Sequence, residues 1–544
     1  MTRPRSLLAL LLSAGVGACG PGTFTGASFD GGGPADADAA VGADAGADAT
    51  PRDFPDPVLT EDGPIHGSDD SAAGLHIYLG IPYAAPPVGE LRFHDPEPAP
   101  AWTTVRDATQ LGYFCPQLDT SWGPAPAASK QSEDCLTLNV WTPARYQNDT
   151  LPVMVYIHGG SFVGGGSGYP AYDGARLAAE GHVVVVTINY RLGPLGFLAH
   201  SAMTAESTHA SSGNFGILDQ LRALAWVQAN VASFGGDRGR VTIFGHSAGG
   251  ASVCTLYASP LAQGLFARAI MQSGFCSANP EDLAQMQALG DQAATALGCA
   301  AASDVLACMR AAPVVSVLHA LAQGVQLEEG VHYRPIVDGY VLDQPSPDAL
   351  AAGEGADVPF MIGTAADEGS IYATTLAITT VAGYQAWVSS KWPHTGPEIL
   401  TLYPAATDAE VHDALTHLIT HWLYTCPARR IATDVAQHAP VWRYEFRHVS
   451  WDAAQRHVGA FHGAELPYVF HRFKMDASHM WNADDESLAH AMILAWSQFA
   501  ATGDATPWAE YDPASDPFEV LDWPLAAASD LHGSECELWD RLVH

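Results

Sequence analysis

The sequence predicts an α/β fold with a large, mixed but mostly parallel central sheet that is flanked by helices. Apolar, β-branched runs recur along the chain, and stretches with helical spacing separate them. Runs that are apolar along their whole length are typical of strands that are buried on both faces of a parallel sheet. Strands that alternate with helices are typical of α/β proteins.

The elements follow in chain order from these patterns. We expect strands at residues 75–81, 152–157, 182–188, 241–244, 267–272, 358–363 and 441–446. A helix is expected at 218–231, and a long amphipathic helix at 486–501. Neither an internal repeat nor a second low-complexity linker interrupts the chain after residue 54, so we expect one catalytic domain at 54–544.

Composition limits the classes of partner. The chain has 544 residues, is 48% hydrophobic and carries a formal net charge of -35. Such an excess of acidic groups argues against nucleic acid and against anionic membrane surfaces as partners. The oligomeric state stays open, with a monomer as the default expectation.

The N-terminal residues resemble a targeting segment. Arg3 and Arg5 precede an apolar stretch at 7–16 that is too short to span a bilayer, and Val16-Gly17-Ala18-Cys19 resembles a bacterial lipoprotein signal. We therefore expect residues 1–18 to be a signal peptide and Cys19 to be lipidated, in a protein exported from a bacterium. It would be anchored to the cell envelope or secreted. An ordinary secretory signal, with Cys19 incidental, is the alternative. Residues 19–53 are rich in Gly, Ala and Asp and predict a disordered tether.

A serine lies between one strand and the helix that follows it. The segment Gly245-His246-Ser247-Ala248-Gly249 comes after the strand at 241–244 and fits the G-x-S-x-G pattern of a nucleophile elbow. Such a turn must be sharp to lift the serine hydroxyl clear of the sheet. Small neighbouring residues allow this, and the helix start presents free backbone N–H groups.

A serine nucleophile needs a base, and the base needs a group that holds its tautomer. In this type of fold their order along the chain is serine, acid, histidine. Asp367 and Glu368 follow the strand at 358–363, and His462 lies in a glycine-bearing loop after the strand at 441–446. His158-Gly159-Gly160-Ser161 follows another strand and fits a loop that offers N–H donors to an oxyanion.

These motifs, taken together, resemble the type-B carboxylesterase/cholinesterase family of α/β-hydrolases from about Leu59 to the C-terminus. The resemblance also rests on Tyr78–Ala84, Pro86–Phe93, Ser132–Asn139, Asn189–Gly193, Gly213–Gln220, Phe234–Asp237 and Gln272–Gly274. It implies an α/β-hydrolase fold, a small-molecule ester as substrate and no cofactor.

The resemblance also assigns roles to single residues. It implies Ser247 as nucleophile, Glu368 as acid and His462 as base, and it makes Asp367 a neighbour of the triad only. It further implies backbone donors at Gly160, Ser161 and Ala248, supporting positions at Ser273, Glu465 and His246, and ion pairs Arg92–Glu133 and Arg191–Asp219.

Two positions depart from the family pattern. Ser161 stands where a third glycine is usual, and His246 stands where a glutamate usually precedes the nucleophile. That glutamate helps cholinesterases to handle a cationic substrate, so the sequence favours a general carboxylesterase. Hydrolysis of related amide, carbamate or polyester bonds is the nearer alternative. A non-catalytic binding module on the same fold is the alternative from another class.

The chain has nine cysteines, eight of them after Cys19, which is consistent with an oxidising compartment. The resemblance implies the bridges Cys115–Cys135, Cys299–Cys308 and Cys426–Cys536. Cys254 and Cys276 remain, either as a pair or as buried thiols. The H-E-x-x-H motif is absent from the sequence, and we expect no metal site.

The lipid anchor leads to a direct test. Replacing Cys19 with Ala removes the acceptor of the lipid, so Cys19→Ala should move the protein from the membrane fraction to the soluble fraction. Immunoblots of both fractions measure this, and a variant that stays with the membranes would contradict lipidation.

Overall fold

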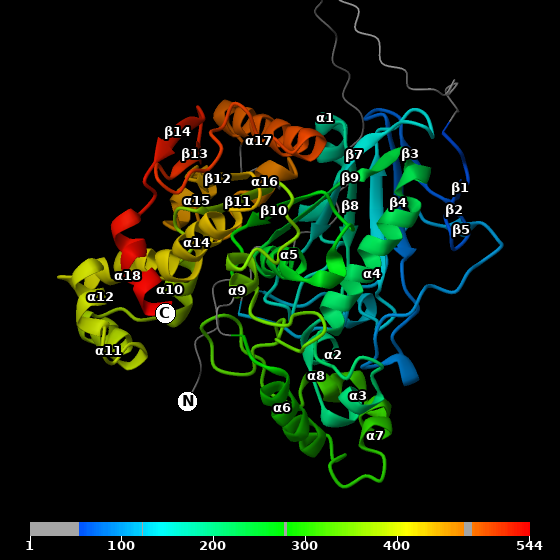
Figure 1. Ribbon diagram of the computed structural model, residues 1–544, viewed down its shortest axis with the longest axis horizontal. Coiled ribbons are helices and arrows are strands. Elements are labelled where there is room, and N and C mark those ends of the chain that lie inside the picture. Colours follow the sequence, from blue (N-terminus) through cyan, green and yellow to red (C-terminus); the bar gives the residue numbers. More distant parts are fainter. Residues whose placement is uncertain (1–53, 122, 277–279, 473–480, 544) are drawn as a thin grey trace, which may run out of the picture.

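The structure is a computed structural model that describes residues 54–543, apart from residues 122, 277–279 and 473–480. The described residues form an 11-stranded sheet in the order β14-β13-β12-β11-β10-β9-β7-β8-β6-β4-β3, beside a 3-stranded sheet, β1-β2-β5 (Figure 1). All pairings from β8 through β7, β9, β10, β11 and β12 to β13 are parallel. The two ends are antiparallel, so the sheet is mixed but mostly parallel, as predicted.

The predicted strands are all present; β12 has the predicted bounds, and the others differ at one or both ends by one to five residues. The strands of the large sheet are β3 (Ser68–Asp70), β4 (Leu75–Pro82), β6 (Thr137–Thr142), β7 (Leu151–Ile157), β8 (Val184–Ile188), β9 (Gly236–His246), β10 (Arg268–Gln272), β11 (Phe360–Ala365), β12 (Val441–Phe446), β13 (Pro517–Leu521) and β14 (Ala526–Ser529). Those of the small sheet are β1 (Val58–Leu59), β2 (Pro64–His66) and β5 (Arg106–Asp107).

The sequence pattern missed β6, although every residue of this strand is buried. Its composition obscures it, because Asn139 and the flanking threonines interrupt the apolar run. The Asn139 side chain is nevertheless satisfied: it donates to Ser167 Oγ at 3.2 Å and to Thr187 Oγ1 at 3.0 Å, and it accepts from the Gly80 N–H at 3.0 Å. A polar side chain with such partners is compatible with a buried strand.

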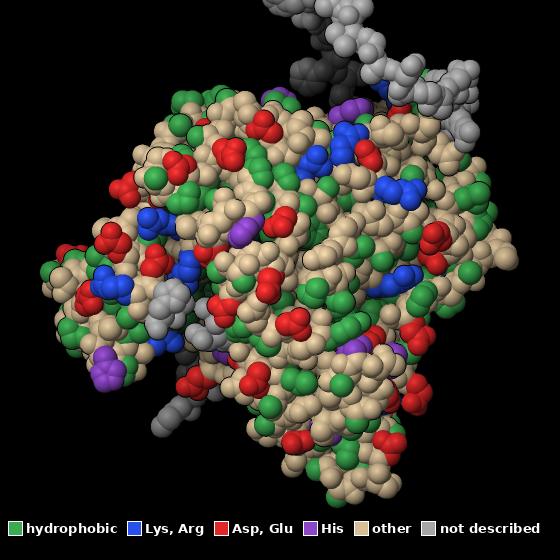
Figure 2. All heavy atoms as spheres, in the orientation of Figure 1, with side chains coloured by type: hydrophobic (Ala, Val, Ile, Leu, Met, Phe, Trp, Pro, Cys, Tyr) green, Lys and Arg blue, Asp and Glu red, His purple; other side chains and the backbone are tan. Residues whose placement is uncertain are grey.

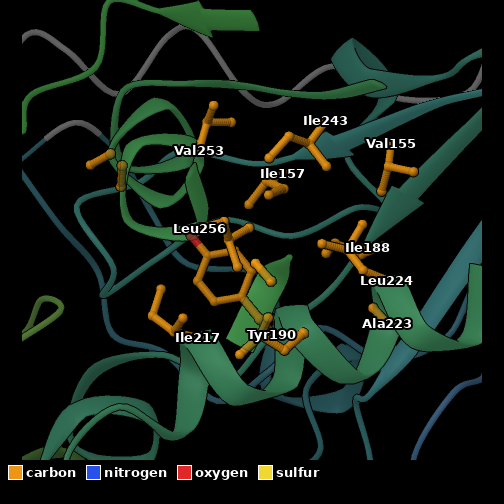
Figure 3. Close-up of a cluster of buried hydrophobic side chains, with 14 of the residues drawn as sticks. Val155, Ile157, Ile188, Tyr190, Ile217, Ala223, Leu224, Ile243, Val253 and Leu256 are labelled. Atoms are coloured by element: carbon orange, nitrogen blue, oxygen red, sulfur yellow. The ribbon is translucent and has the colours of Figure 1, made fainter. Parts of the chain in front are cut away.

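Alternate residues of the central strands enter two different cores. Val155, Ile157 and Ile243 pack with α4 (Phe215–Asn230) and α5 (Ala248–Ala258) on one face, where Figure 3 shows them beside Leu224 and Leu256. The other face presents residues such as Met154, Tyr156 and Phe244 to α1 (Ala175–Gly181) and α17 (Ala483–Thr502). The central strands therefore need near-continuous apolar sequences, because helices cover both faces of the sheet.

The two predicted helices are longer at their N-termini than their patterns suggested. Helix α17 begins at Ala483 rather than 486, because the Asn482 side chain accepts from the N–H of Asp485 while Asp485 accepts from that of Asn482, a capping box. Gly503, at φ 76°, ends it. The predicted helix at 218–231 is α4, which begins at Phe215.

The remaining helices pack on the sheet, on the helices that cover it or on one another (Figure 1). They are α2 (Gly193–Phe197), α3 (Ser201–Glu206), α6 (Leu283–Ala296), α7 (Val305–Ala311), α8 (Val314–Leu318), α9 (Ser346–Ala351), α10 (Ser370–Leu376), α11 (Val381–Lys391), α12 (Gly396–Leu402), α13 (Val411–Thr420), α14 (Cys426–Val435), α15 (Trp451–Arg456), α16 (Leu466–Val469) and α18 (Gly533–Val543). Tyr384, Tyr403, Leu418 and Trp539 belong to a separate hydrophobic cluster under α11 to α13 and α18.

Two buried ion pairs brace the loops around the sheet. Arg191 Nη2 lies 2.7 Å from Asp219 Oδ1, and Arg92 Nη2 lies 2.6 Å from Glu133 Oε2. Both pairs are bidentate, since the Nε of each arginine donates to the second carboxylate oxygen of its partner. These are the pairs that the family resemblance implied.

Four disulfides join the described cysteines. They are Cys115–Cys135, Cys299–Cys308, Cys426–Cys536 and Cys254–Cys276, the last of which the sequence left open. Disulfides of this number are typical of proteins from an oxidising compartment.

Acidic and basic side chains are interspersed on the visible face of the molecule (Figure 2). None of the helices within the described ranges is long and apolar enough to cross a membrane.

Candidate active site

Ser247 occupies a strained turn between β9 and α5. Its backbone has φ 59° and ψ -122°, a conformation that L-residues rarely adopt. The Ser247 N–H donates to the carbonyl of Gln272, the last residue of β10, at 3.0 Å. Ser247 therefore lies at the carboxyl edge of the parallel strands, directly before the N-terminus of a helix.

Two glycines of the G-x-S-x-G motif are required by contact distances. A Cβ on Gly249 would lie 1.9 Å from the carbonyl oxygen of Ile157, and a Cβ on Gly245 would lie 2.5 Å from the carbonyl carbon of Gly249. Both neighbours are backbone atoms, which cannot move aside cheaply. The absence of side chains here lets the turn pass directly against the end of β7.

The loop after β7 lies beside the serine. A Cβ on Gly159 would be 3.1 Å from Ser247 Cβ, and Gly160 has φ 116°, with its Cβ position 2.1 Å from the Gly164 carbonyl oxygen. Within the described chain, the N–H groups of Gly160 and Ser161 donate no backbone hydrogen bond. Ala248 is the first residue of α5, where N–H groups lack an intrahelical acceptor. These three donors are free for a ligand.

Glu368 and His462 form a close buried pair. Glu368 Oε2 lies 2.5 Å from His462 Nδ1, and Glu368 Oε1 accepts from the Ala365 N–H at 2.7 Å. Glu368 is fully buried and His462 is 8% exposed. Because Glu368 follows β11 and His462 follows β12, neighbouring parallel strands bring the two residues to the same sheet edge.

Asp367 fixes the loop that carries the histidine. Its Oδ2 accepts from the Ala460 N–H at 2.9 Å, and its own N–H donates to the Ala460 carbonyl at 2.9 Å. A Cβ on Gly459 would lie 2.2 Å from the same carboxylate oxygen. The family resemblance assigned Asp367 no role of its own, and no sequence motif would have revealed these hydrogen bonds.

Burial controls the charges in the site. It raises the pKa of the Glu368 carboxyl to about 8, against the opposing effects of Ser273 and the Ala365 N–H. Burial also lowers the pKa of the His462 imidazole to about 3. Both shifts disfavour charge, and across a 2.5 Å contact the two groups titrate as one coupled pair.

Several buried polar atoms in the site lack a hydrogen-bond partner among the described residues. They include Ser247 Oγ, His462 Nε2 and Ser161 Oγ, together with His246 Nε2, Ser273 Oγ and Glu465 Oε2. Buried polar atoms in native proteins are normally paired, so such orphans indicate a place where a ligand or water binds. His246 connects the two loops: its ring packs 4.5 Å from the His462 ring, centroid to centroid.

Three further predicted residues surround the pair. His246 Nε2 lies 3.8 Å from Glu465 Oε1, which accepts from Gln272 Nε2 at 3.3 Å. Burial, followed by the nearby His462, lowers the pKa of His246 well below its usual value. Burial, followed by the Glu368 charge, raises the pKa of Glu465 to about 8. Ser273 lies beside Glu368, and its N–H donates to the Gly363 carbonyl at 2.8 Å.

One group of potential metal ligands occurs in the described part of the chain. It consists of His421, His532 and Glu535, none of which is among the residues named above. Sequence inspection missed it because the residues are far apart along the chain. The residues around Ser247 offer no comparable group within the described ranges.

The sequence is similar to known esterases over most of its length. The model of the Carboxylesterase family matches residues 55–539. The chain is 35% identical over 497 residues to a para-nitrobenzyl esterase from Bacillus subtilis, covering 87% of this chain and 96% of that protein. It is 36% identical over 460 residues to a fumonisin B1 esterase from Sphingopyxis macrogoltabida, covering 82% and 83%.

A mammalian relative is equally similar. The cocaine esterase of Oryctolagus cuniculus is 36% identical over 477 residues, which cover 81% of this chain and 86% of that protein. The family match, the 11-stranded sheet and the esterase relatives agree with one another. The chain therefore belongs to the carboxylesterase family, with an α/β-hydrolase fold, and it is a carboxylic-ester hydrolase.

Proposed function

We propose that this protein cleaves carboxylic esters through an acyl-enzyme intermediate, with Ser247, Glu368 and His462 as its catalytic triad. The contact between His462 Nδ1 and Glu368 Oε2, at 2.5 Å, carries the proposal. While Glu368 is ionised, this contact favours the tautomer in which Nδ1 bears the proton and Nε2 is a free lone pair. His462 Nε2 and Ser247 Oγ make no hydrogen bond to each other or to any other described residue, so Nε2 is available to take the serine proton when substrate binds.

Acylation begins when Ser247 Oγ attacks the ester carbonyl. His462 Nε2 takes the serine proton as the bond forms, and the resulting imidazolium is stabilised by the Glu368 carboxylate. The N–H groups of Gly160, Ser161 and Ala248 donate to the oxyanion, with the N-terminus of α5 adding its positive dipole end. His462 then gives the proton to the leaving alcohol.

Deacylation repeats these roles with water. His462 Nε2 removes a proton from a water molecule, which attacks the acyl carbon, and the proton passes to Ser247 Oγ as the acid leaves. The buried surroundings of the pair strengthen each electrostatic contact. Because the donors are held by the backbone, they need little reorganisation as negative charge develops.

The surroundings of the serine favour a general carboxylesterase with uncharged substrates. His246 takes the place of a carboxylate, and burial keeps its imidazole neutral, so this position offers no anion to a cationic alcohol.

The nucleophile has a direct test. Ser247→Ala removes the attacking oxygen, so hydrolysis of short-chain nitrophenyl esters should fall at least ~10³-fold while the melting temperature is kept. Ser389→Ala, an exposed serine-to-alanine change in α11, is the control and should retain wild-type rates. Unchanged activity of Ser247→Ala would exclude Ser247 as nucleophile.

The acid is tested against its neighbour. In Glu368→Gln the amide can donate to Nδ1 and stabilise the wrong tautomer, so kcat should fall ~10⁴-fold. Asp367→Asn removes the charge of the residue before Glu368 but keeps an oxygen that can accept from the Ala460 N–H. The loss of kcat in Asp367→Asn should therefore stay below about tenfold, which is the effect expected when one hydrogen bond is weakened. A larger loss in Asp367→Asn than in Glu368→Gln would reverse the assignment.

A further inference from the structure

Two histidines and a glutamate meet where the C-terminal helix packs on the rest of the chain. His421, His532 and Glu535 each direct one potential ligand atom into a common space, and these atoms lie within 4.8 Å of one another. His421 is buried, while His532 and Glu535 are partly exposed. An ion could therefore enter from solvent and be held against a buried ligand.

The topology holds this group together in two ways. His421 begins a π-helical turn, η8 (His421–Thr425), between α13 and α14, whereas His532 and Glu535 lie at the start of α18. Helix α18 packs on η8 and α14 (Figure 1). The disulfide Cys426–Cys536 links the end of the π turn to the first turn of α18, so the two halves of the group cannot separate.

The backbone is unusual at both histidines. Single π turns are rare and occur frequently at functional sites, and this one starts at His421. His532 has φ 54°, in the left-handed region that favours glycine. Strain of this kind persists only where the surroundings impose it, and it is found at ligand-binding positions more often than elsewhere.

Both histidines also have the outer contacts that metal ligands need. His421 Nδ1 lies 3.1 Å from the Tyr403 hydroxyl, and no hydrogen bond among the described residues uses its Nε2. His532 Nε2 lies 3.6 Å from Glu445 Oε1, a buried carboxylate oxygen that has no hydrogen-bond partner among the described residues. A carboxylate or hydroxyl behind the ligating imidazole orients the ring and sets its tautomer.

The third ligand, Glu535, places a carboxylate beside the two imidazoles. A divalent cation would supply the positive charge that Glu535, which has no ion-pair partner among the described residues, lacks here, whereas Glu445 is already paired with Arg447.

We propose that His421, His532 and Glu535 bind one divalent cation of the Zn²⁺ class, which clamps α18 onto the π turn. Two imidazoles and one carboxylate are a typical zinc set, with a water completing the tetrahedron. Ligand atoms around a tetrahedral Zn²⁺ are about 3.4 Å apart, as bonds of ~2.1 Å require. Small rotations of the partly exposed His532 and Glu535 side chains would shorten the distances between ligand atoms, now up to 4.8 Å, to this value.

The clamp has a physical connection to the pair formed by Glu368 and His462. The π turn carries Tyr424, whose ring lies 5.0 Å from the His462 ring. Thr420, the residue before this turn, accepts through its Oγ1 from the Gly369 N–H at 2.9 Å, next to Glu368. A cation that stiffens the turn would thus stabilise the contacts that Tyr424 makes with His462 and that Thr420 makes beside Glu368.

The test is a calorimetric titration of the full chain with Zn²⁺ after removal of bound metal by a chelator. We expect one ion per chain and a higher melting temperature in its presence. His532→Asn and Glu535→Gln should each weaken binding at least ~10-fold and abolish the thermal shift. Asparagine tolerates the left-handed backbone, so His532→Asn should fold normally.

Two matched variants control for the many other histidines and acidic groups. His457→Asn replaces an exposed histidine that also has φ 54°, and Glu537→Gln removes the same charge from the exposed side of α18. Both should bind Zn²⁺ like the wild type. Equal affinity in all variants, or an equal loss in His457→Asn, would overturn the proposal. Melting temperatures and stoichiometry report on this site whether or not Ser247 is the nucleophile.

Discussion

The close approach of the turn at Ser247 to the end of β7 is the constraint on which the rest of the site depends. Gly249 passes so near the Ile157 carbonyl that a single Cβ would lie 1.9 Å from its oxygen. Since the loop after β7 continues into Gly159 and Gly160, the same contact brings the free N–H groups to the serine. The bond from the Ser247 N–H to Gln272 then ties the turn to β10. The proposed nucleophile and the proposed oxyanion donors are thereby positioned by backbone contacts.

The proposed acid, Glu368, and the proposed base, His462, depend on a second, independent connection. Asp367 and Ala460 exchange two hydrogen bonds, which lock the loop after β11 to the loop after β12. Glu368, the residue after Asp367, and His462, two residues after Ala460, can then meet at 2.5 Å in a buried environment. Burial penalises charge on both groups, so their proximity is maintained by the surrounding loops rather than by the ion pair itself.

Much of this arrangement could be predicted from the sequence, because parallel sheets leave a strong pattern. The runs at 152–157 and 241–244 predicted strands, and glycines after them predicted turns at the same sheet edge. Features that depend on buried polar groups were missed. Strand β6 was missed because it contains Asn139, whose hydrogen-bond partners come from distant segments. The hydrogen bonds between Asp367 and Ala460 and the proximity of His421 to His532 were missed for the same reason. They depend on long-range packing, which local periodicity does not encode.

The central claim is that Ser247 is the nucleophile that the sheet edge and its loops activate. The most direct measurement is mass spectrometry of the protein after reaction with a fluorophosphonate, with the adduct mapped to a peptide. We predict one adduct per chain, on Ser247, with slower labelling in Glu368→Gln. An adduct on another serine, such as Ser161 or Ser273, or an active esterase that remains unlabelled, would contradict it.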